Sequence, residues 1–191
     1  MTEEQKQYIE NNIDLIEYNE WETFFHNAPE GIGGVLYEAG IDFMTVLGYV
    51  PSRAFAGCSN ITSITIPDNV TSIESFAFLG CSNLKNIDLG TGVRSIGITA
   101  FSRCSSLKNI TIPKGITELS ENMFFLCSNL TQVVIPNSMN HIKVGVFTDC
   151  PNLFEIIFNG TKREFRNIKK SKGWTDDSIA IRCSDGDFIS K

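Results

Sequence analysis

The segment Ala77–Leu89, AFLGCSNLKNIDL, carries the pattern that decides the fold. Its central cysteine belongs to a series spaced by 23 residues: Cys58, Cys81, Cys104, Cys127 and Cys150. A phenylalanine stands three residues before each of them: Phe55, Phe78, Phe101, Phe124 and Phe147. Leucine or isoleucine follows each cysteine at the third position, and aliphatic residues recur at fixed positions beyond it. The chain therefore contains five copies of one unit.

Each unit contains a short strand. In the quoted copy, Ile87 and Leu89 point to one face while Asn86 and Asp88 point to the other, because side chains alternate along a strand. A period of this length with a Leu-x-x-Ile-x-Ile core is typical of leucine-rich repeats, whose windings stack so that each apolar position packs on its own copy. We therefore predict an α/β solenoid, a leucine-rich repeat array of five 23-residue coils over residues 47–160.

The repeated cysteine is interpreted as a small apolar residue in a buried column. Adjacent thiols of such a column point the same way, which disfavours the geometry of a disulfide. No Cys-x-x-Cys pair or neighbouring histidine accompanies the series, so the pattern does not favour a metal site. We predict no metal and no cofactor.

The two ends are predicted to cover the array. Residues 1–46 are assigned to a helical N-terminal cap, because Thr2 and Gln5 fit a capping box and a second helix is expected from about Gly31 to Ala39. The side chains expected to dock on the first coil are Trp21, Phe24, Phe25, Leu36 and Phe43.

Residues 161–191 are assigned to an α/β C-terminal cap. A helix is predicted over 161–172, with Phe165 and Ile168 inward and a basic outer face, followed by a strand pair over 178–189.

Charge is concentrated at the ends of the chain. Residues 1–46 hold ten acids and one base (−9), residues 161–191 hold eight bases and five acids (+3), and the total is −6. The acidic balance disfavours nucleic acid as a partner. We expect a monomer, with head-to-tail association as an alternative that the opposite end charges favour. No apolar run approaches the ~18 residues of a membrane span, and the acidic N-terminus is unlike a secretory signal, so we expect a cytoplasmic protein.

The unit IP-x-x-V-T-S-I-x-x-x-A-F-x-x-C-S-x-L-x-x-I resembles the BspA-like, or treponemal-type, leucine-rich repeat over residues 47–160. The tail NGTKREFRNIKKSKGW is similar to the segment that often closes such arrays, and NNIDLIEYNEWETFF resembles helical leaders associated with gut bacteria and their phages. The resemblance implies a solenoid used for binding, with cell-surface adhesion as its best-known role.

Catalytic groups are sparse. His26 and His141 are the only histidines, and His141 is placed in a repeat turn. Neither has a nucleophile or carboxylate at a meaningful spacing in the sequence, and the glycine-rich GIGG at Gly31–Gly34 lacks the Gly-Lys-Ser/Thr of a phosphate loop. We therefore predict no catalytic residues and no enzymatic activity.

The outward residues of the strands are the predicted contact surface. The partner-binding residues are Asn86, Asp88, Asn109, Thr111, Gln132, Val134, Phe154, Glu155 and Ile157. Val134 and Ile157 are apolar where the earlier strands are polar, and Phe154 lies beside them in the sequence. An apolar patch on a polar face favours a protein contact. The alternative is that the C-terminal cap covers this patch.

The function predicted from these observations is a non-enzymatic protein-binding leucine-rich repeat module. The resemblance of the leader favours a mobile-element or phage protein that binds and blocks a host factor in the host cytoplasm. One alternative is a cell-surface adhesion fragment whose export signal lies outside this sequence. A second alternative is a small-ligand binder built on the helical cap.

Overall fold

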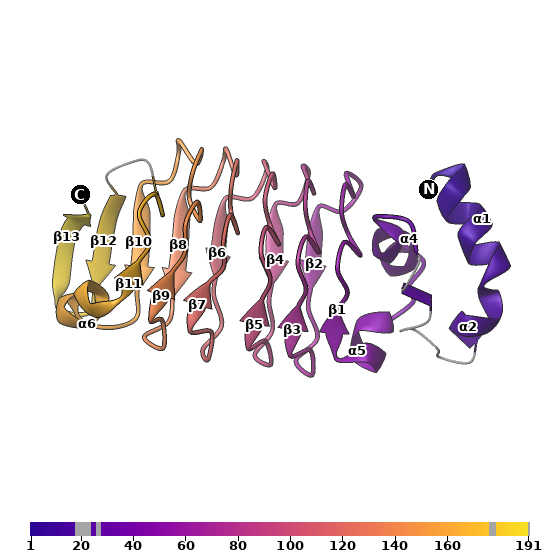
Figure 1. Ribbon diagram of the computed structural model, residues 1–191, viewed down its shortest axis with the longest axis horizontal. Coiled ribbons are helices and arrows are strands. Elements are labelled where there is room, and N and C mark those ends of the chain that lie inside the picture. The colour runs from indigo at the N-terminus through magenta and orange to yellow at the C-terminus, as the bar shows by residue number, and fades with distance from the viewer. Residues whose placement is uncertain (18–23, 26–27, 176–178, 191) are drawn as a thin grey trace.

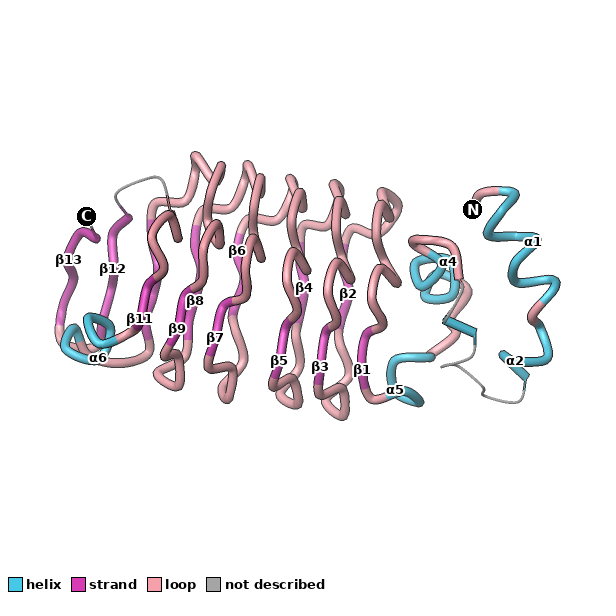
Figure 2. Tube along the Cα trace, in the orientation of Figure 1, coloured by secondary structure: helices cyan, strands magenta, loops and turns pink. Residues whose placement is uncertain are grey.

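The computed structural model describes residues 1–17, 24–25, 28–175 and 179–190, which form an elongated solenoid with its two caps at opposite ends (Figure 1). The helices at the N-terminal end are α1 (Glu3–Asn11), α2 (Ile13–Glu17), α4 (Ile32–Glu38) and α5 (Phe43–Leu47). Loops make up most of each winding, and the strands between them are short (Figure 2). The predicted solenoid class is confirmed.

The strands of the solenoid form two faces. The first, called the strand face below, consists of β2 (Ser63–Thr65), β4 (Asn86–Asp88), β6 (Asn109–Thr111), β8 (Gln132–Ile135), β10 (Glu155–Phe158) and β12 (Ile179–Cys183). The second face consists of β1 (Tyr49–Val50), β3 (Ser72–Ile73), β5 (Ser95–Ile96), β7 (Glu118–Leu119), β9 (His141–Ile142) and β11 (Lys169–Lys170). Paired strands run parallel, and within the repeats residue pairs such as Ile64 and Ile87 keep the 23-residue register.

The core consists of columns of identical or similar side chains. The rings of the repeated phenylalanines, from Phe55 to Phe147, are at most 2% exposed and stack with centroids 4.8 to 5.8 Å apart and planes within 13° of parallel. The aliphatic columns fill the space between the two faces. A single winding could not cover this apolar surface, so each winding depends on its neighbours for stability.

The five repeated cysteines form the predicted buried column and are not bridged by disulfides. The Sγ of Cys81 donates to the carbonyl of Phe55 in the preceding winding at 3.0 Å, and the next three cysteines of the series repeat this bond at 3.0–3.2 Å. The cysteine therefore satisfies a buried backbone acceptor as well as filling space. Because burial disfavours the thiolate, the pKa of Cys58 is raised to about 12.

Two positions at the corner of each winding have left-handed backbone. The first position, five residues before the cysteine, is occupied by Arg53, Phe76, Thr99, Asn122 and Gly145. The second, directly before the cysteine, is occupied by Gly57, Gly80, Arg103, Leu126 and Asp149. Seven of these ten residues carry a side chain, although this region of backbone space favours glycine. The corner of the solenoid is therefore locally strained.

The N-terminal cap follows the prediction. The Thr2 hydroxyl accepts the Gln5 N–H at 3.1 Å, and the Gln5 side chain accepts the Thr2 N–H at 2.9 Å. Phe24, Leu36 and Phe43 are at most 1% exposed, Phe25 is half-buried, and the ring of Phe43 lies 5.8 Å from that of Phe55, the first of the column. Trp21 and His26 lie outside the described residues. The short helix α5 was not predicted.

The C-terminal end extends the array beyond the predicted five coils. Strand β11 pairs with β9 and strand β12 pairs with β10, so both faces continue for a further winding. Ala180 pairs with Glu155, 25 residues earlier, and Gly173 stands where the next cysteine would be. The 23-residue pattern therefore missed this winding.

The cap is otherwise close to its prediction. Helix α6 (Lys162–Asn167) is shorter than the predicted 161–172, because the chain enters the second face at Lys169. Phe165 and Ile168 are buried as expected. Strand β12 forms an antiparallel hairpin with β13 (Gly186–Ser190), which confirms the predicted strand pair.

Candidate partner-binding face

The outward side chains of the strand face form two rows across the sheets. One row contains Ser63, Asn86, Asn109, Gln132, Glu155 and Ala180. Strand pairing aligns Ser63 with Asn86, and separately aligns Asn109 with the three residues that follow it in the row, while the 23-residue repeat relates Asn86 to Asn109. The other row contains Thr65, Asp88, Thr111, Val134, Ile157 and Arg182. Eight of the nine predicted partner-binding residues belong to these rows, and Phe154 directly precedes β10. The alternation read from the sequence therefore placed these residues on one face.

Exposure divides this face into two parts. Asn86, Asp88, Asn109 and Thr111 are exposed, as expected for the outward positions of a strand. Toward the C-terminal end, Gln132, Val134 and Ile157 are half-buried. Val134 and Ile157 are thus less exposed to solvent than the alternation of the strand sequence predicts.

The prediction that Glu155 is an exposed contact residue is wrong. Its side chain is buried, with the residue 6% exposed, because two neighbours in the same row or the adjacent strand enclose it. An Nη atom of Arg182 lies 2.7 Å from Glu155 Oε1, and Gln132 Nε2 donates to Oε2 at 2.5 Å. Arg182 belongs to the sixth winding, which the sequence pattern missed. A residue of the C-terminal cap thus covers Glu155, while Phe154 of the apolar patch stays exposed.

Phe154 is the one aromatic residue of the predicted set, and 61% of its surface is accessible. The equivalent positions of earlier windings hold the polar residues Thr62, Lys85, Lys108 and Thr131. The backbone of Phe154 remains paired, since its N–H donates to Thr131 and its carbonyl accepts from Ala180. The ring is therefore held on a fixed backbone while it faces solvent.

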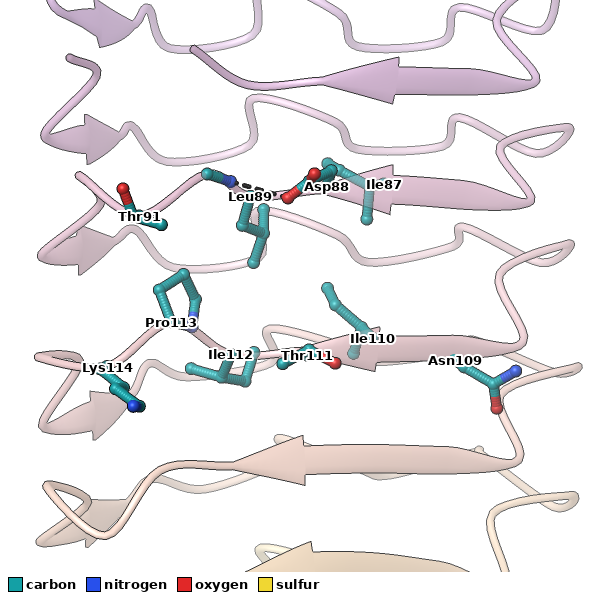
Figure 3. Close-up of a pocket in the computed structure, with 11 residues that line it drawn as sticks. Ile87, Asp88, Leu89, Thr91, Asn109, Ile110, Thr111, Ile112, Pro113 and Lys114 are labelled. Carbon is teal, nitrogen blue, oxygen red and sulfur yellow. Dashed lines mark hydrogen bonds between the residues drawn. The ribbon is translucent and has the colours of Figure 1, made fainter. Parts of the chain in front are cut away.

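A notch of about 440 Å³ interrupts the strand face between β4 and β6 (Figure 3). Its walls include three predicted residues, Asp88, Asn109 and Thr111, and Lys114 from the turn after β6. Ile87 is half-buried at its floor, whereas Ile64 and Ile110 of the same column are at most 3% exposed. The notch was not predicted, because nothing in the 23-residue pattern changes between these two strands.

The predicted position of His141 in a repeat turn is wrong, because His141 belongs to a polar cluster on the second face. This residue lies in strand β9 rather than in a turn, and its Nδ1 lies 3.6 Å from Glu118 Oε2 while its Nε2 lies 3.4 Å from the Ser171 hydroxyl. Burial and the nearby Lys143 lower the pKa of His141, and Glu118 opposes this shift. Residues distant in sequence meet here because equivalent positions of successive windings are neighbours.

Two general features of the described residues bear on the chemistry of the chain. No helix among them has the length and apolar character to cross a bilayer. Within the same parts of the chain, no three histidine, cysteine or acidic side chains converge on a common point as metal ligands.

Comparison with solved structures gives relatives of the same architecture. A leucine rich cell surface protein from Faecalibacterium prausnitzii A2-165 is 31% identical, with a TM-score of 0.63, over 66% of this chain and 33% of that protein. The T. pallidum leucine-rich repeat protein is 29% identical, with a TM-score of 0.56, over 70% of this chain and 65% of its own. A Bacteroides ovatus leucine-rich repeat protein, 22% identical with a TM-score of 0.52 over 71% of this chain and 41% of that one, shares the fold.

The present chain therefore spans a third of the first relative and just under two thirds of the second. No curated protein matches it. The family model for the BspA type leucine rich repeat region matches residues 48–170 in six copies, one more than the cysteine register indicates. Since this match covers more than half of the sequence, the chain belongs to the BspA-type leucine-rich repeat family.

Proposed function

We propose that this chain is a non-enzymatic protein-binding module and that the strand face contacts the partner. The repeats of the family and the two bacterial relatives support a binding or adhesion role. The observation that carries the proposal is Phe154, an aromatic ring 61% exposed in a column of polar residues. Burial of such a ring by a partner contributes about 1.5–3 kcal/mol, the scale of an interface hot spot.

The mechanism proposed is shape and patch complementarity. The exposed amides of Asn86 and Asn109, the carboxylate of Asp88 and the hydroxyl of Thr111 supply hydrogen bonds. Phe154 supplies the apolar anchor. Polar contacts of this kind set the register of an interface and a desolvated aromatic residue supplies much of its affinity. Glu155 is excluded from the proposed contact set because Arg182 and Gln132 already enclose it.

A capture experiment with matched variants tests the choice of face. The purified chain and the variants Phe154→Asp, Val134→Asp and Ile157→Asp are each used to capture proteins from natural host material. Ile98→Asp is the control, because Ile98 is an exposed aliphatic residue, 44% accessible, in the turn after β5 rather than on the strand face. We expect Phe154→Asp to lose a partner that Ile98→Asp retains. Equal retention by all four variants would exclude this face.

Adhesion at a cell surface is a second candidate, favoured by the Faecalibacterium relative, which is named a cell surface protein. Labelled chain applied to intact cells and to cytoplasmic extract separates the two candidates. Saturable binding to intact cells favours adhesion, and binding confined to extract favours an intracellular partner. Origin from a phage or mobile element, with blockade of a host factor, remains a prediction from the leader.

Head-to-tail association also remains a prediction. It rests on the acidic N-terminal segment and the exposed cations Arg163 and Arg166 of α6, which lie at opposite ends of the solenoid (Figure 1). Sedimentation at low and high salt tests it, because opposite end charges predict an assembly that dissociates as salt increases. Small-ligand binding remains a prediction as well, to be tested by thermal shift with nucleotides and metal salts.

A further inference from the structure

The contact between two successive windings, residues 86–108 and 109–131, differs from the other contacts in the array. On the strand face, β2 pairs with β4 and β6 pairs with β8, but β4 and β6 belong to separate sheets. On the second face, β3 pairs with β5 and β7 pairs with β9, but β5 and β7 are likewise separate. Both faces therefore open at the same place, and the notch lies in the strand-face opening.

Individual backbone bonds locate this opening. The N–H groups of Ile66 and Ile112 each donate to the neighbouring winding at 2.8 Å, yet the equivalent N–H of Leu89 makes no such bond within residues 28–175. Three further backbone N–H groups in that range, those of Lys108, Thr117 and Ser120, also lack a bond to the preceding winding. The equivalent N–H groups one winding earlier and one winding later make that bond, at 2.8–3.0 Å.

The two windings stay joined along one corner. The N–H groups of Thr99, Phe101 and Arg103 donate to the carbonyls of the next winding at 2.8–3.0 Å. The phenylalanine column also continues through this corner, with the rings of Phe101 and Phe124 5.8 Å apart. The arrangement is that of two blocks whose backbones are bonded along a single line. On the other sides the strands are unpaired, and side chains bridge the junction: the Ser120 hydroxyl donates to the Ile96 carbonyl at 2.6 Å and the Asn129 amide donates to the Ser105 carbonyl at 2.7 Å.

Local sequence explains the opening. Glycines bring the chain after β4 close against the preceding winding: a Cβ on Gly92 would lie 1.9 Å from the Asp68 carbonyl oxygen, and one on Gly97 would lie 2.4 Å from the Ser75 nitrogen. On the opposite side, the Arg94 side chain fills space toward the following winding. A Cβ on Gly115 would lie 3.1 Å from Arg94 Cδ.

The equivalent residues of neighbouring windings are the smaller Thr71 and Thr117. The Arg94 guanidinium is held in place, because it donates to the Thr91 carbonyl at 2.7 Å. Arg94 therefore acts as a spacer that only this winding carries.

We propose that this junction is a hinge about which two blocks rotate, opening and closing the notch: residues 49–108 form one block, and residues 109–175 with 179–190 form the other. The corner bonds of residues 99–103 form its axis. The motion required is small, because Cα atoms of β4 and β6 already approach within 8 Å and paired strands lie about 4.8 Å apart. Closure forms the missing backbone bonds but presses the Arg94 side chain against the following winding, whereas opening leaves those N–H groups without a backbone partner and exposes Ile87.

The hinge lies beneath the strand face. Asp88 belongs to one block and Thr111 to the other, so rotation changes the spacing between them. A partner that contacts both residues would fix one curvature of the array. This last consequence rests on the proposed function, whereas the hinge itself is tested without any partner.

Amide hydrogen exchange by NMR is the first measurement. We expect the amides of Leu89, Lys108, Thr117 and Ser120 to exchange at least about tenfold faster than their bonded counterparts in adjacent windings. Spin labels then measure motion. The pair Thr65→Cys and Val134→Cys spans three strand steps across the notch, and Asn109→Cys with Ala180→Cys spans three steps without crossing it.

The expected result is a broader distance distribution for the pair that crosses the notch. The variant Arg94→Thr removes the spacer, and we expect it to narrow that distribution to the width of the control pair and to slow the exposed amides. If these amides exchange fast but the distance distributions of the two spin-label pairs are equally narrow, the gap is rigid and the hinge is refuted. Amides as slow as their counterparts would overturn the open geometry itself.

Discussion

Replacing Thr99 by glycine is expected to stabilise the protein. Thr99 has φ of 58°, and Gly145, at the equivalent position two windings later, shows that the corner accepts glycine. A β-branched residue in the left-handed region costs about 1–2 kcal/mol, whereas glycine loses about 0.5–1 kcal/mol more backbone entropy on folding. The net expectation is a gain of about 0.5–1 kcal/mol, measured as an increase of roughly 0.3 M in the urea midpoint at unchanged slope.

The reverse substitution provides the matched control. Gly80 has φ of 71°, and a Cβ there would meet nothing closer than 4.0 Å, so Gly80→Ala changes backbone preference without a clash. We expect it to lower the free energy of unfolding by about 1 kcal/mol. If Thr99→Gly destabilises the protein while Gly80→Ala leaves it unchanged, backbone strain is not what limits the corner, and the reasoning from φ fails.

Three further predictions concern the core and the titratable groups. Phe101→Ala should lower the free energy of unfolding by about 3–5 kcal/mol in urea denaturation, because its ring lies between two others at 5.3 and 5.8 Å. A thiol reagent at pH 8 should leave all six cysteines unlabelled in the folded protein and label all six in urea, because every thiol is buried and burial raises the pKa of Cys58 to about 12. The lowered pKa of His141 contributes stability that is present above about pH 6.5 and lost at lower pH, so urea midpoints should fall between pH 7 and 5.5 and His141→Gln should reduce that fall.

Most of the fold could be predicted because its information is periodic. A column such as Phe55 to Phe147 repeats one choice five times, so no single residue has to be interpreted alone. The sixth winding was missed because it departs from the repeat in two ways. Its strand β12 pairs with β10 at a spacing of 25 residues instead of 23, and Gly173 stands at the position where the next repeated cysteine is expected. Helix α5 was missed because a five-residue helix leaves little periodic signal.

The site was less predictable because exposure depends on neighbours that the pattern does not specify. Alternation correctly placed Glu155 outward, but the carboxylate is buried by Arg182, a residue from the unpredicted winding. The notch depends on Gly92 and Arg94, which act through close packing rather than through hydrophobic periodicity. The neighbours of His141, Glu118 and Ser171, come from adjacent windings. They lie 23 and 30 residues away in the sequence, so their contact with His141 follows from the stacking of the windings and not from a local motif.

In this array, the side chains at repeated positions make contacts between neighbouring windings. The thiols of Cys81, Cys104, Cys127 and Cys150 each donate to the preceding winding. Asn83, Asn129 and Asn152 likewise donate side-chain amides to carbonyls about one winding earlier. A buried residue that continues such a column packs against or hydrogen-bonds to the neighbouring windings, so little of its surface is free to contact a partner. Phe154 departs from a column of threonine and lysine, and Arg94 departs from a column of glycine, threonine and asparagine. Such departures have no copy to pack against, and for that reason they are where binding and motion are expected to concentrate.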